Sequence, residues 1–286
     1  MFMDNKLDYE YVFRTLVALT ASYLNRNNLR TMVLGISGGI DSTVVAAIAN
    51  EVSKENEIKF IGRSLPIRNK DDEFDVSKLV GEAFCEDFKV CRMGDIYDRF
   101  KAGVDYFENS NLQTSIANGN IQARLRMIYL YNLASVHRGI VLSTDNQTEY
   151  QLGFWTLHGD VGDFNPLFGL WKHEVYELAE WLLTYYANNS EEEKYNALKK
   201  SMKLTPTDGL GISNSDLEQI GAKSYNDVDD ILENTVNVLT NDEIWSYLYT
   251  KYGKDVVDKV CKRHVFSTFK RKNLPIVIER RMYEQR

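Results

Sequence analysis

The sequence predicts an α/β protein with a doubly wound, mostly parallel sheet flanked by helices. Short apolar and β-branched runs alternate along the chain with longer segments in which apolar residues recur at helical spacing. The run over residues 31–36 leads directly into a glycine turn and a helix, which is typical of the repeating unit of wound sheets. A hydrophobic fraction of 44% over 286 residues indicates a globular protein with a sizeable core.

The first half of the chain is expected to follow the order β-α-β-α-β. Each predicted strand is a short apolar run, and each predicted helix has one apolar side. The predicted strands are 31–36, 58–65, 88–93 and 139–144. The predicted helices are 8–25, a helix that begins near Thr43, 75–84, and 121–137 with Arg124 and Arg126 on its first turns.

The second half is expected to be mainly helical. Residues 149–172 combine glycines, acidic residues and Pro166, which predict an irregular and exposed loop. Residues 188–201 are strongly charged and predict an exposed helical insert, to which we assign no chemistry. Residues 205–215 are rich in Pro, Gly and Ser and predict a loop. The predicted helices of this half are 171–187, 225–233 and 241–252.

The stretch VLGISGGIDST over residues 33–43 predicts a site for phosphate. A strand that ends in a glycine turn and a helix start directs several backbone N–H groups, and the positive end of the helix dipole, at one point. The glycines allow a tight bend and close approach of phosphate oxygens, and Asp41 or Ser42 is expected to cap the helix. An acidic Asp41 beside phosphate is favourable only if a Mg²⁺ ion lies between them.

A second polar turn is expected to face the same pocket. The predicted strand 139–144 ends in Thr144 and Asp145, as the strand 31–36 ends in the glycine turn. Ligands of wound sheets bind at the carboxyl ends of strands. Phe154 and Trp155, in the loop that comes next, are either core residues or surfaces for stacking on a ring, and core is the more common fate of such residues.

Charge and cysteine content limit the class of protein. The net charge of −7 disfavours a broad nucleic-acid-binding surface, although basic residues gather in the tail 262–286. The apolar run 274–278 predicts that this tail docks on the body, where its cations would suit an anionic substrate. The chain has no apolar run of about 18 residues, no signal-like N-terminus and no CxxC spacing among its three cysteines. A cytoplasmic protein without a membrane span is expected.

Several segments in the same order resemble one known family. The run SGGIDS at 37–42 is neither a Walker A loop nor GxGxxG, and it resembles the pyrophosphate-binding loop of the ATP pyrophosphatases. Nearly the whole chain resembles the ammonia-dependent NAD synthetases within that superfamily. The segments that carry this resemblance are LGISGGIDST at 34–43, NGNIQARLRMIYLY at 118–131, STDNQTEYQLGFWTLHGDVGDFNPLFGLWK at 143–172, TPTDGL at 205–210, SYNDVDDILE at 224–233 and FKRKNLPIVI at 269–278.

The resemblance implies an adenine nucleotide alpha-hydrolase-like fold and a ligase that forms a C–N bond. It implies a single NAD synthetase domain over 1–286 without a glutaminase domain, and a homodimer whose dinucleotide site lies near the helix 121–137. The implied reaction is the Mg²⁺- and ATP-dependent amidation of deamido-NAD to NAD with ammonia. It passes through an adenylated carboxylate and releases AMP and pyrophosphate. Free ammonia is expected as the nitrogen donor unless a separate glutaminase subunit supplies it.

The resemblance also implies a role for individual residues. Asp41 and Glu149 would hold Mg²⁺, and Asp41 and Lys172 would be catalytic. The residues implied in binding ATP are Gly35, Ile36, Ser37, Gly38, Gly39, Ile40, Asp41, Ser42, Thr144, Lys172 and Thr207. The residues implied in binding deamido-NAD are Arg124, Asp163, Lys270 and Arg271. The loops 156–166 and 205–215 would be lids that exclude water from the adenylate.

The chain departs from the family pattern at four places. Near the C-terminus, Phe269 stands where His is common, or Lys270 does if the gap is placed differently. Leu157, followed by His158, stands where the family usually has a lysine, which removes one cation from the dinucleotide site. The GDVGD stretch at 159–163 is one residue short, which affects the register of Asp163. The segment 188–201 is longer than usual. These differences affect dinucleotide binding more than activation by ATP.

Two alternative functions retain the phosphate loop. A tRNA-modifying ATP pyrophosphatase would usually carry cysteine pairs and an extended basic surface, and this chain has neither CxxC nor a positive net charge. A nucleotide-binding sensor that has lost catalysis would be favoured by Leu157 and the shortened loop. Release of pyrophosphate that depends on both the dinucleotide and ammonium distinguishes the synthetase from both alternatives.

Overall fold

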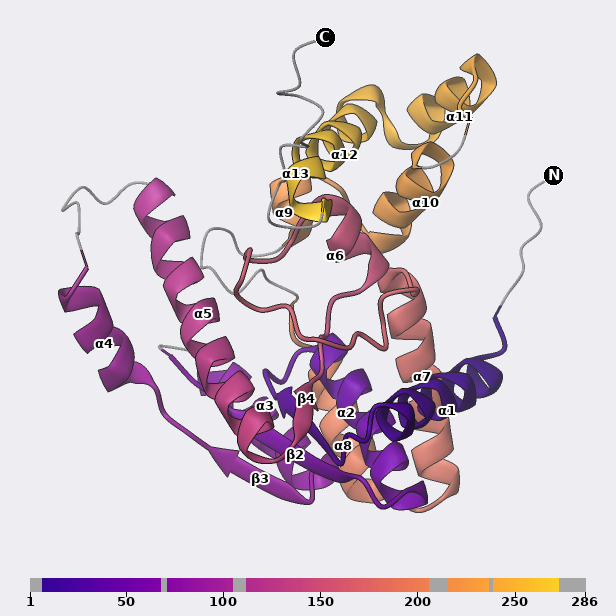
Figure 1. The fold of residues 1–286 in the computed structure, drawn as a ribbon. Helices are drawn as coiled ribbons and strands as arrows, with labels where there is room; N and C mark the ends of the chain where they lie inside the picture. Colours follow the sequence, from indigo (N-terminus) through magenta and orange to yellow (C-terminus); the bar gives the residue numbers. More distant parts are fainter. Residues whose placement is uncertain (1–6, 68–70, 105–111, 206–215, 237–238, 273–286) are drawn as a thin grey trace, which may run out of the picture.

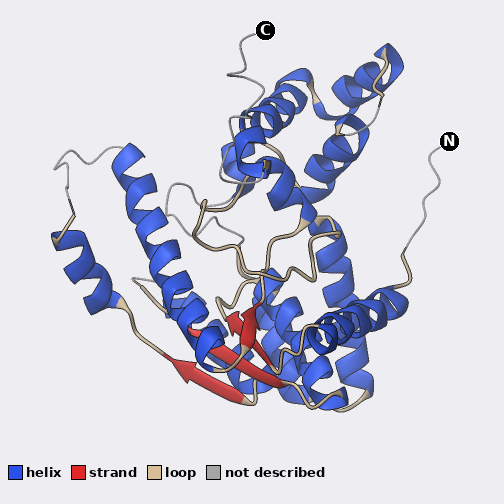
Figure 2. Ribbon diagram, in the orientation of Figure 1, coloured by secondary structure: helices blue, strands red, loops and turns tan. Residues whose placement is uncertain are grey.

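The core of the protein is a four-stranded parallel sheet in the order β3-β2-β1-β4 (Figure 2). The structure is a computed structural model that describes residues 7–67, 71–104, 112–205, 216–236 and 239–272. The strands are β1 (Thr31–Gly35), β2 (Lys59–Ser64), β3 (Asp87–Val90) and β4 (Gly139–Val141). The chain moves outward from β1 to β3 and then returns to place β4 on the other side of β1.

The order of the strands in the sheet determines where the expected binding site lies. Val33 of β1 pairs with Ile61 of β2 and with Val141 of β4, so the carboxyl ends of these strands lie at one edge of the sheet. The direction of winding reverses between β1 and β4, and wound sheets bind ligands outside the strand ends at such a reversal. The turns that follow β1 and β4 therefore flank the expected binding position.

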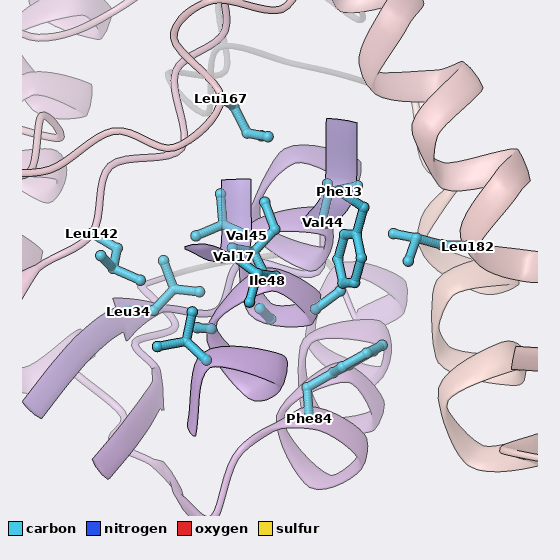
Figure 3. Close-up of a cluster of buried hydrophobic side chains, with 14 of the residues drawn as sticks. Phe13, Val17, Leu34, Val44, Val45, Ile48, Phe84, Leu142, Leu167 and Leu182 are labelled. Atoms are coloured by element: carbon cyan, nitrogen blue, oxygen red, sulfur yellow. The ribbon is translucent and has the colours of Figure 1, made fainter. Parts of the chain in front are cut away.

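One face of the sheet is buried under a large hydrophobic core. Successive strand residues point to opposite faces, and Met32 and Leu34 point into this core. Figure 3 shows Leu34 and Leu142 on one side of this core, and Phe13, Val44 and Leu182 on the other. The helices that form this layer are α1 (Tyr9–Arg26), α2 (Ile40–Glu55), α3 (Asp71–Phe84), α7 (Lys172–Asn188) and α8 (Glu192–Ser201).

The opposite face of the sheet carries a second cluster. Val33, Ile61 and Val141 pack there against α4 (Gly94–Ala102) and α5 (Leu112–Val136). Figure 1 shows these two helices on the other side of the sheet from α1 and α7. Helices on both faces of a parallel sheet confirm the predicted α/β, doubly wound fold class.

The C-terminal helices form a third cluster away from the sheet (Figure 1). Its buried residues include Leu152, Val228, Ile231 and Leu248. The elements of this part are α6 (Gln147–Leu152), α9 (Asp216–Ile220), α10 (Tyr225–Thr235), α11 (Asp242–Tyr252), α12 (Lys254–Phe266) and α13 (Thr268–Arg271). Among the described helices, none is long and apolar enough to cross a membrane.

Several element boundaries differ from those predicted. β1 ends at Gly35, α3 begins at Asp71, and α4 and α12 were not expected from the sequence. α5 begins at Leu112, so Arg124 and Arg126 lie in the middle of the helix rather than on its first turns. The Ser/Asn/Gly-rich residues at 115–120 hid this start because they have no apolar periodicity of their own.

Two predictions about exposure and regularity were wrong. Residues 149–152 were expected in an irregular loop, but they form most of the helix α6. The segment 188–201 is helical as predicted but is not an exposed insert, because Ala197, Leu198 and Ser201 of α8 are buried. α8 packs its apolar side against α3 and α7 and turns its charged side to solvent.

Candidate active site

The turn after β1 is fixed by contacts on both of its sides. Gly38 has φ of +89°, and a Cβ atom at this position would lie 2.8 Å from the backbone nitrogen of Ser77 on α3. The hydroxyl of Ser201, the last residue of α8, donates a 2.7 Å hydrogen bond to the Gly38 carbonyl oxygen. A glycine turn held in this way directs the first N–H groups of α2 at one point, which suits an anion.

Glycine, not a polar side chain, occupies the N-cap of α2. The helix begins at Ile40, and Gly39 is the N-cap residue without a side-chain hydrogen bond. The prediction that Asp41 or Ser42 caps this helix was therefore wrong. The hydroxyl of Ser42 donates a 3.0 Å hydrogen bond to the Gly39 carbonyl and lies 2.9 Å from that of Ser37. No N-cap side chain competes with a ligand for the first N–H groups.

Lys172 lies between two carboxylates that come from different elements. Its Nζ is 2.5 Å from Oδ2 of Asp41 on α2 and 2.9 Å from Oε1 of Glu149 on α6. The lysine side chain is 1% exposed, whereas the two carboxylates are 16% and 18% exposed. The structure thus brings together the three residues that the sequence singled out for catalysis and metal binding, directly beside the glycine turn.

Burial and charge act against each other in this group. Burial acts to lower the pKa of Lys172, but the charges of Asp41 and Glu149 outweigh it and raise the pKa well above its ordinary value. Burial, and then the charge of Asp41, raise the pKa of the Glu149 carboxyl, which Lys172 opposes. The charged form of Lys172 is therefore favoured by the two acidic groups that flank it.

Asn146 connects this cluster to the turn after β4. The side-chain nitrogen of Asn146 donates a 2.9 Å hydrogen bond to Oδ1 of Asp41. Its side-chain oxygen caps α6 by accepting from the N–H of Glu149, and Glu149 accepts in return from the N–H of Asn146. This capping box fixes the direction of Glu149 and orients Asp41 at the same time.

A cavity of about 910 Å³ opens beside the cluster. Asp145, which follows Thr144 in the turn after β4, is one of its walls, and burial together with the charge of Asp160 raises the pKa of Asp145 to about 7. The rings of Tyr150 and Trp155 stack within the wall, with centroids 5.5 Å apart and an interplanar angle of 5°. Such a pair offers a flat apolar surface for a ligand ring.

Cations from the C-terminal helices line the same cavity. Lys270 and Arg271 of α13 are among its walls, as is Arg124 of α5 on the opposite side. Lys270 Nζ also donates to the carbonyls of Gly153 and Trp155, and Arg271 donates to the carbonyl of Gln151 at 2.6 Å. The tail therefore docks on the body as predicted, at least up to Lys272, and its cations anchor the loop after α6.

Arg124 and Asp163, which the resemblance also implies in dinucleotide binding, differ in their position relative to the cavity. Arg124 Nη2 donates a 3.1 Å hydrogen bond to the carbonyl of Leu157, and both residues line the cavity. Asp163 is not among the lining residues, but its carboxylate accepts a 2.8 Å hydrogen bond from the hydroxyl of Tyr131, which does line the cavity. Thr207 and the loop around it lie outside the described residues, as does the tail beyond Lys272.

The carboxylates present fit a Mg²⁺ ion that also binds a substrate phosphate. Asp41 and Glu149 are hard oxygen donors, and a cation, the Lys172 ammonium, already bridges them. In the described part of the chain, no group of three or more His, Cys, Asp and Glu side chains could hold a metal by itself. Mg²⁺ commonly takes one or two carboxylates and completes its shell with phosphate oxygens and water.

Four residues of the site were not identified from the sequence. Asn146, Thr148, Ser201 and Asp229 are polar, are less than 2% exposed and are hydrogen-bonded to the residues that surround Lys172 and the glycine turn. Asn146 and Thr148 lie in the segment that resembles the family, and Asp229 lies in the SYNDVDDILE segment. Ser201 lies in the charged segment and gave no signal in the sequence.

Comparison with known proteins agrees with this geometry. The NAD synthase family model matches residues 12–274. The chain is 33% identical over 204 residues to the NH3-dependent NAD+ synthetase of Thermoplasma volcanium, covering 71% of this chain and 76% of that protein. It is 32% identical over 255 residues to the enzyme of the same description from Thermoplasma acidophilum, covering 88% of this chain and 91% of that protein.

A solved structure shares the fold. The NMN synthetase from Francisella tularensis superposes with a TM-score of 0.76 at 24% identity, over 96% of this chain and 100% of that chain. At this identity the likeness shows the fold alone. With the family match over nearly the whole chain, and with the glycine turn, Asp41, Glu149 and Lys172 brought together in space, this chain belongs to the NAD synthase family, whose members are ligases that form a C–N bond.

Proposed function

We propose that this chain converts deamido-NAD (nicotinic acid adenine dinucleotide) to NAD with ammonia, using ATP and Mg²⁺. The observation that carries the proposal is the Lys172 ammonium held between Asp41 and Glu149, beside a glycine turn built for phosphate. Such a site can hold the triphosphate of ATP next to an acidic acceptor that lies in the adjoining cavity. The match to the NAD synthase family supports the nicotinate acceptor.

The chemistry has two steps that balance. The nicotinate carboxylate attacks the α-phosphorus of ATP, an acyl–adenylate bond forms, and the bond to pyrophosphate breaks. Ammonia then attacks the acyl carbon, the amide bond forms, AMP leaves, and a proton passes to solvent or to a nearby base. Neither step needs a nucleophile from the protein. The catalytic task is therefore to bring two anions together and to hold the departing pyrophosphate.

The residues of the site suit this task. The Lys172 ammonium, which stays charged, faces the negative charge that builds on the phosphates, and the first N–H groups of α2 would hold the leaving pyrophosphate. Asp41 and Glu149 would hold Mg²⁺, which when bound neutralises phosphate charge. Asn146 keeps the Asp41 carboxylate oriented through its 2.9 Å hydrogen bond.

The cavity suits an acceptor that carries both a ring and phosphates. Tyr150 and Trp155 provide the stacked surface, and Arg124 and Lys270 provide positive charge on opposite walls. Leu157 leaves this cavity one cation short of the family pattern, and His158, which also lines it, is the nearest replacement. An acceptor with fewer phosphates would need fewer cations, so nicotinate mononucleotide is the comparison acceptor for the assay.

The proposal is tested by measuring AMP and pyrophosphate release from ATP and Mg²⁺ with ammonium chloride and each acceptor in turn. Turnover that requires both deamido-NAD and ammonium supports it. Turnover with the mononucleotide but not with deamido-NAD, or turnover with tRNA, would show that the acceptor is not deamido-NAD. Binding of ATP without turnover under any of these conditions would favour a nucleotide sensor and would refute the synthetase. Glutamine in place of ammonium is expected to give no turnover.

We also propose that the chain acts in the cytoplasm as a homodimer through α5. Ile128 and Val136 on this helix are 65% and 70% exposed, which a second copy would cover. Cys85, Cys91 and Cys261 are all free thiols, which suits a reducing compartment. Light scattering on the wild type and on Ile128→Lys tests the assembly, because a charge in the interface should yield monomers.

A further inference from the structure

The helix that carries Lys172 caps its own N-terminus only in part, through the 2.7 Å hydrogen bond that the N–H of Trp171 donates to Oε2 of Glu174. Lys172 is the first residue of α7, and Trp171 in the N-cap position makes no side-chain cap hydrogen bond to it. The backbone N–H of Lys172 donates instead to the hydroxyl oxygen of Thr148 on α6, over 2.8 Å. The backbone N–H of His173 donates to Oδ2 of Asp229 on α10, over 2.9 Å. Two other helices therefore supply the acceptors for the N–H groups of Lys172 and His173.

Asp229 connects these contacts. Its carboxylate is 0% exposed, and Oδ1 accepts a 2.5 Å hydrogen bond from the Thr148 hydroxyl. Oδ2 accepts from the His173 N–H and also lies 2.9 Å from Nδ1 of the His173 ring. A carboxylate buried without such donors would be very unfavourable, and a negative charge at a helix N-terminus is stabilised by the helix dipole. This arrangement fixes α6, α7 and α10 relative to one another.

The same face of α10 also contacts the lysine side chain. Tyr225 lies four residues before Asp229, so the two side chains lie on one side of the helix. The Tyr225 ring centroid is 5.5 Å from the Nζ atom of Lys172. α10 thus contacts the Lys172 ammonium directly, through the Tyr225 ring. It acts on the Lys172 backbone indirectly, because Asp229 accepts from the Thr148 hydroxyl that in turn accepts from the Lys172 N–H.

We propose that Asp229 is a positioning residue for Lys172, acting through Thr148 and the first turn of α7. The proposal rests on the proposed function for the catalytic part of Lys172. Loss of the Asp229 contacts removes the acceptor of the His173 N–H and the partner that orients the Thr148 hydroxyl, so the first turn of α7 no longer fixes the Lys172 ammonium between Asp41 and Glu149. Asp229 itself touches no reacting atom, because its carboxylate is enclosed by Thr148 and His173.

Paired substitutions separate positioning from general stability. Thr148→Val keeps the shape but removes the hydroxyl, and Thr148→Ser restores it. Asp229→Asn removes one acceptor oxygen, and Asp230→Asn is its matched control. Asp230 is the adjacent carboxylate on α10, and it pairs with Lys251 and Tyr252 in the third cluster rather than with α7. If Asp229→Asn fails to fold, the Thr148 pair decides the outcome.

The kinetic readout compares the effect of each variant on kcat with its effect on KM. Each variant is first shown to be folded by circular dichroism. Thr148→Val and Asp229→Asn are expected to lower kcat by about tenfold or more and to change the KM for ATP by less than about twofold. Thr148→Ser and Asp230→Asn are expected to stay within about twofold of the wild type in both. Wild-type kcat in folded Thr148→Val and Asp229→Asn overturns the proposal.

A second readout needs no turnover. Trace acetylation of the protein without substrates, read by mass spectrometry, compares Lys172 with Lys199, an exposed lysine of α8. Lys172 labelling relative to Lys199 is expected to rise severalfold in Thr148→Val and Asp229→Asn and to stay at the wild-type level in Thr148→Ser and Asp230→Asn. Unchanged labelling in all four variants overturns the positioning role. If the wild type amidates no acceptor, the proposed function fails and this labelling alone decides the inference.

Discussion

The hydroxyl of Ser201 donates a hydrogen bond to the carbonyl oxygen of Gly38 across 2.7 Å, joining the end of α8 to the glycine turn after β1. The same hydroxyl lies 2.8 Å from that of Thr43 in the first turn of α2. Ser201 is fully buried, so no water replaces either contact. The strongly charged segment 188–201 therefore has a structural role at the site, because the buried hydroxyl of its last residue, Ser201, contacts the turn.

Ser201→Ala is expected to weaken the turn and the binding of ATP together. The change leaves the buried Gly38 carbonyl without this donor, which costs about 1–3 kcal/mol. We expect a lower free energy of unfolding in urea and a higher dissociation constant for ATP by calorimetry. Lys199→Ala on the exposed side of α8 is the control. Unchanged ATP affinity in Ser201→Ala would show that α8 supports only the core.

Gly38→Ala is expected to destabilise the protein and to remove ATP binding. Alanine at φ +89° is strained by about 1–3 kcal/mol, and its Cβ would also meet the backbone nitrogen of Ser77 at 2.8 Å. Gly94→Ala is the matched control, because a Cβ at Gly94 would meet no atom within 4 Å. Gly94 also begins a helix, where alanine has the higher propensity. Equal stability losses in both variants would contradict the special role of the turn.

Lys172→Met is expected to lower kcat by about 10²–10³-fold, since it removes a preorganised charge from the reacting phosphates. The methionine side chain is of similar length but leaves Asp41 and Glu149 facing each other without a cation. Steady-state AMP release measures the effect, with Lys194→Met as a comparison at another buried lysine. A kcat near that of the wild type would remove Lys172 from the catalytic group.

Removal of one carboxylate is expected to raise the Mg²⁺ concentration that gives half-maximal turnover. Asp41→Asn and Glu149→Gln each delete one hard anionic donor, and we expect an increase of about tenfold or more. Glu193→Gln, an exposed residue on α8, is the control and should show the wild-type Mg²⁺ dependence. Chelation by EDTA should abolish turnover of the wild type. Activity that persists in EDTA would exclude a metal-held phosphate.

The pair of His173 and Asp229 is expected to stabilise the protein more at low pH. The hydrogen bond to Asp229 raises the pKa of His173 above its ordinary value, and burial only partly opposes this. A raised pKa in the folded state contributes stability that is full below about pH 6.5 and is lost as the pH rises through the folded-state pKa. Urea unfolding of the wild type and of His173→Gln, at about pH 6 and about pH 9, should show the larger difference at the lower pH. A difference that grows with pH would contradict this assignment.

Local patterns in the sequence predict the centre of the fold well. Neighbouring residues in the sequence determine three of its elements, so the residue types alone predict them. These elements are the strand 31–36, its glycine turn and the helix that follows. The turns after the strands 31–36 and 139–144 were expected to share one pocket, because carboxyl ends of parallel strands lie at one edge. The structure places Asp41, Asn146 and Lys172 in contact at that edge.

Features that depend on distant partners could not be predicted from local pattern. α8 has a high density of charge, which hides the short apolar face of Ala197 and Leu198 that meets α3 and α7. Asp229 reads as an ordinary helix-surface acid, since nothing near it in sequence shows that Thr148 and His173 will enclose it. The expected polar cap at Asp41 or Ser42 is absent because α2 already begins at Ile40, so that both residues lie inside the helix and Gly39 is the N-cap.

α7 spans two cores that would otherwise be separate. Trp171 at its start packs with the C-terminal cluster, while Val175, Leu178 and Leu182 pack with the cluster under the sheet. The first residue of α7, Lys172, therefore lies at the junction of the two cores. Because α13 also carries Lys270 on the wall of the cavity, we expect a ligand that fills the cavity to alter the surroundings of the Lys172 amine.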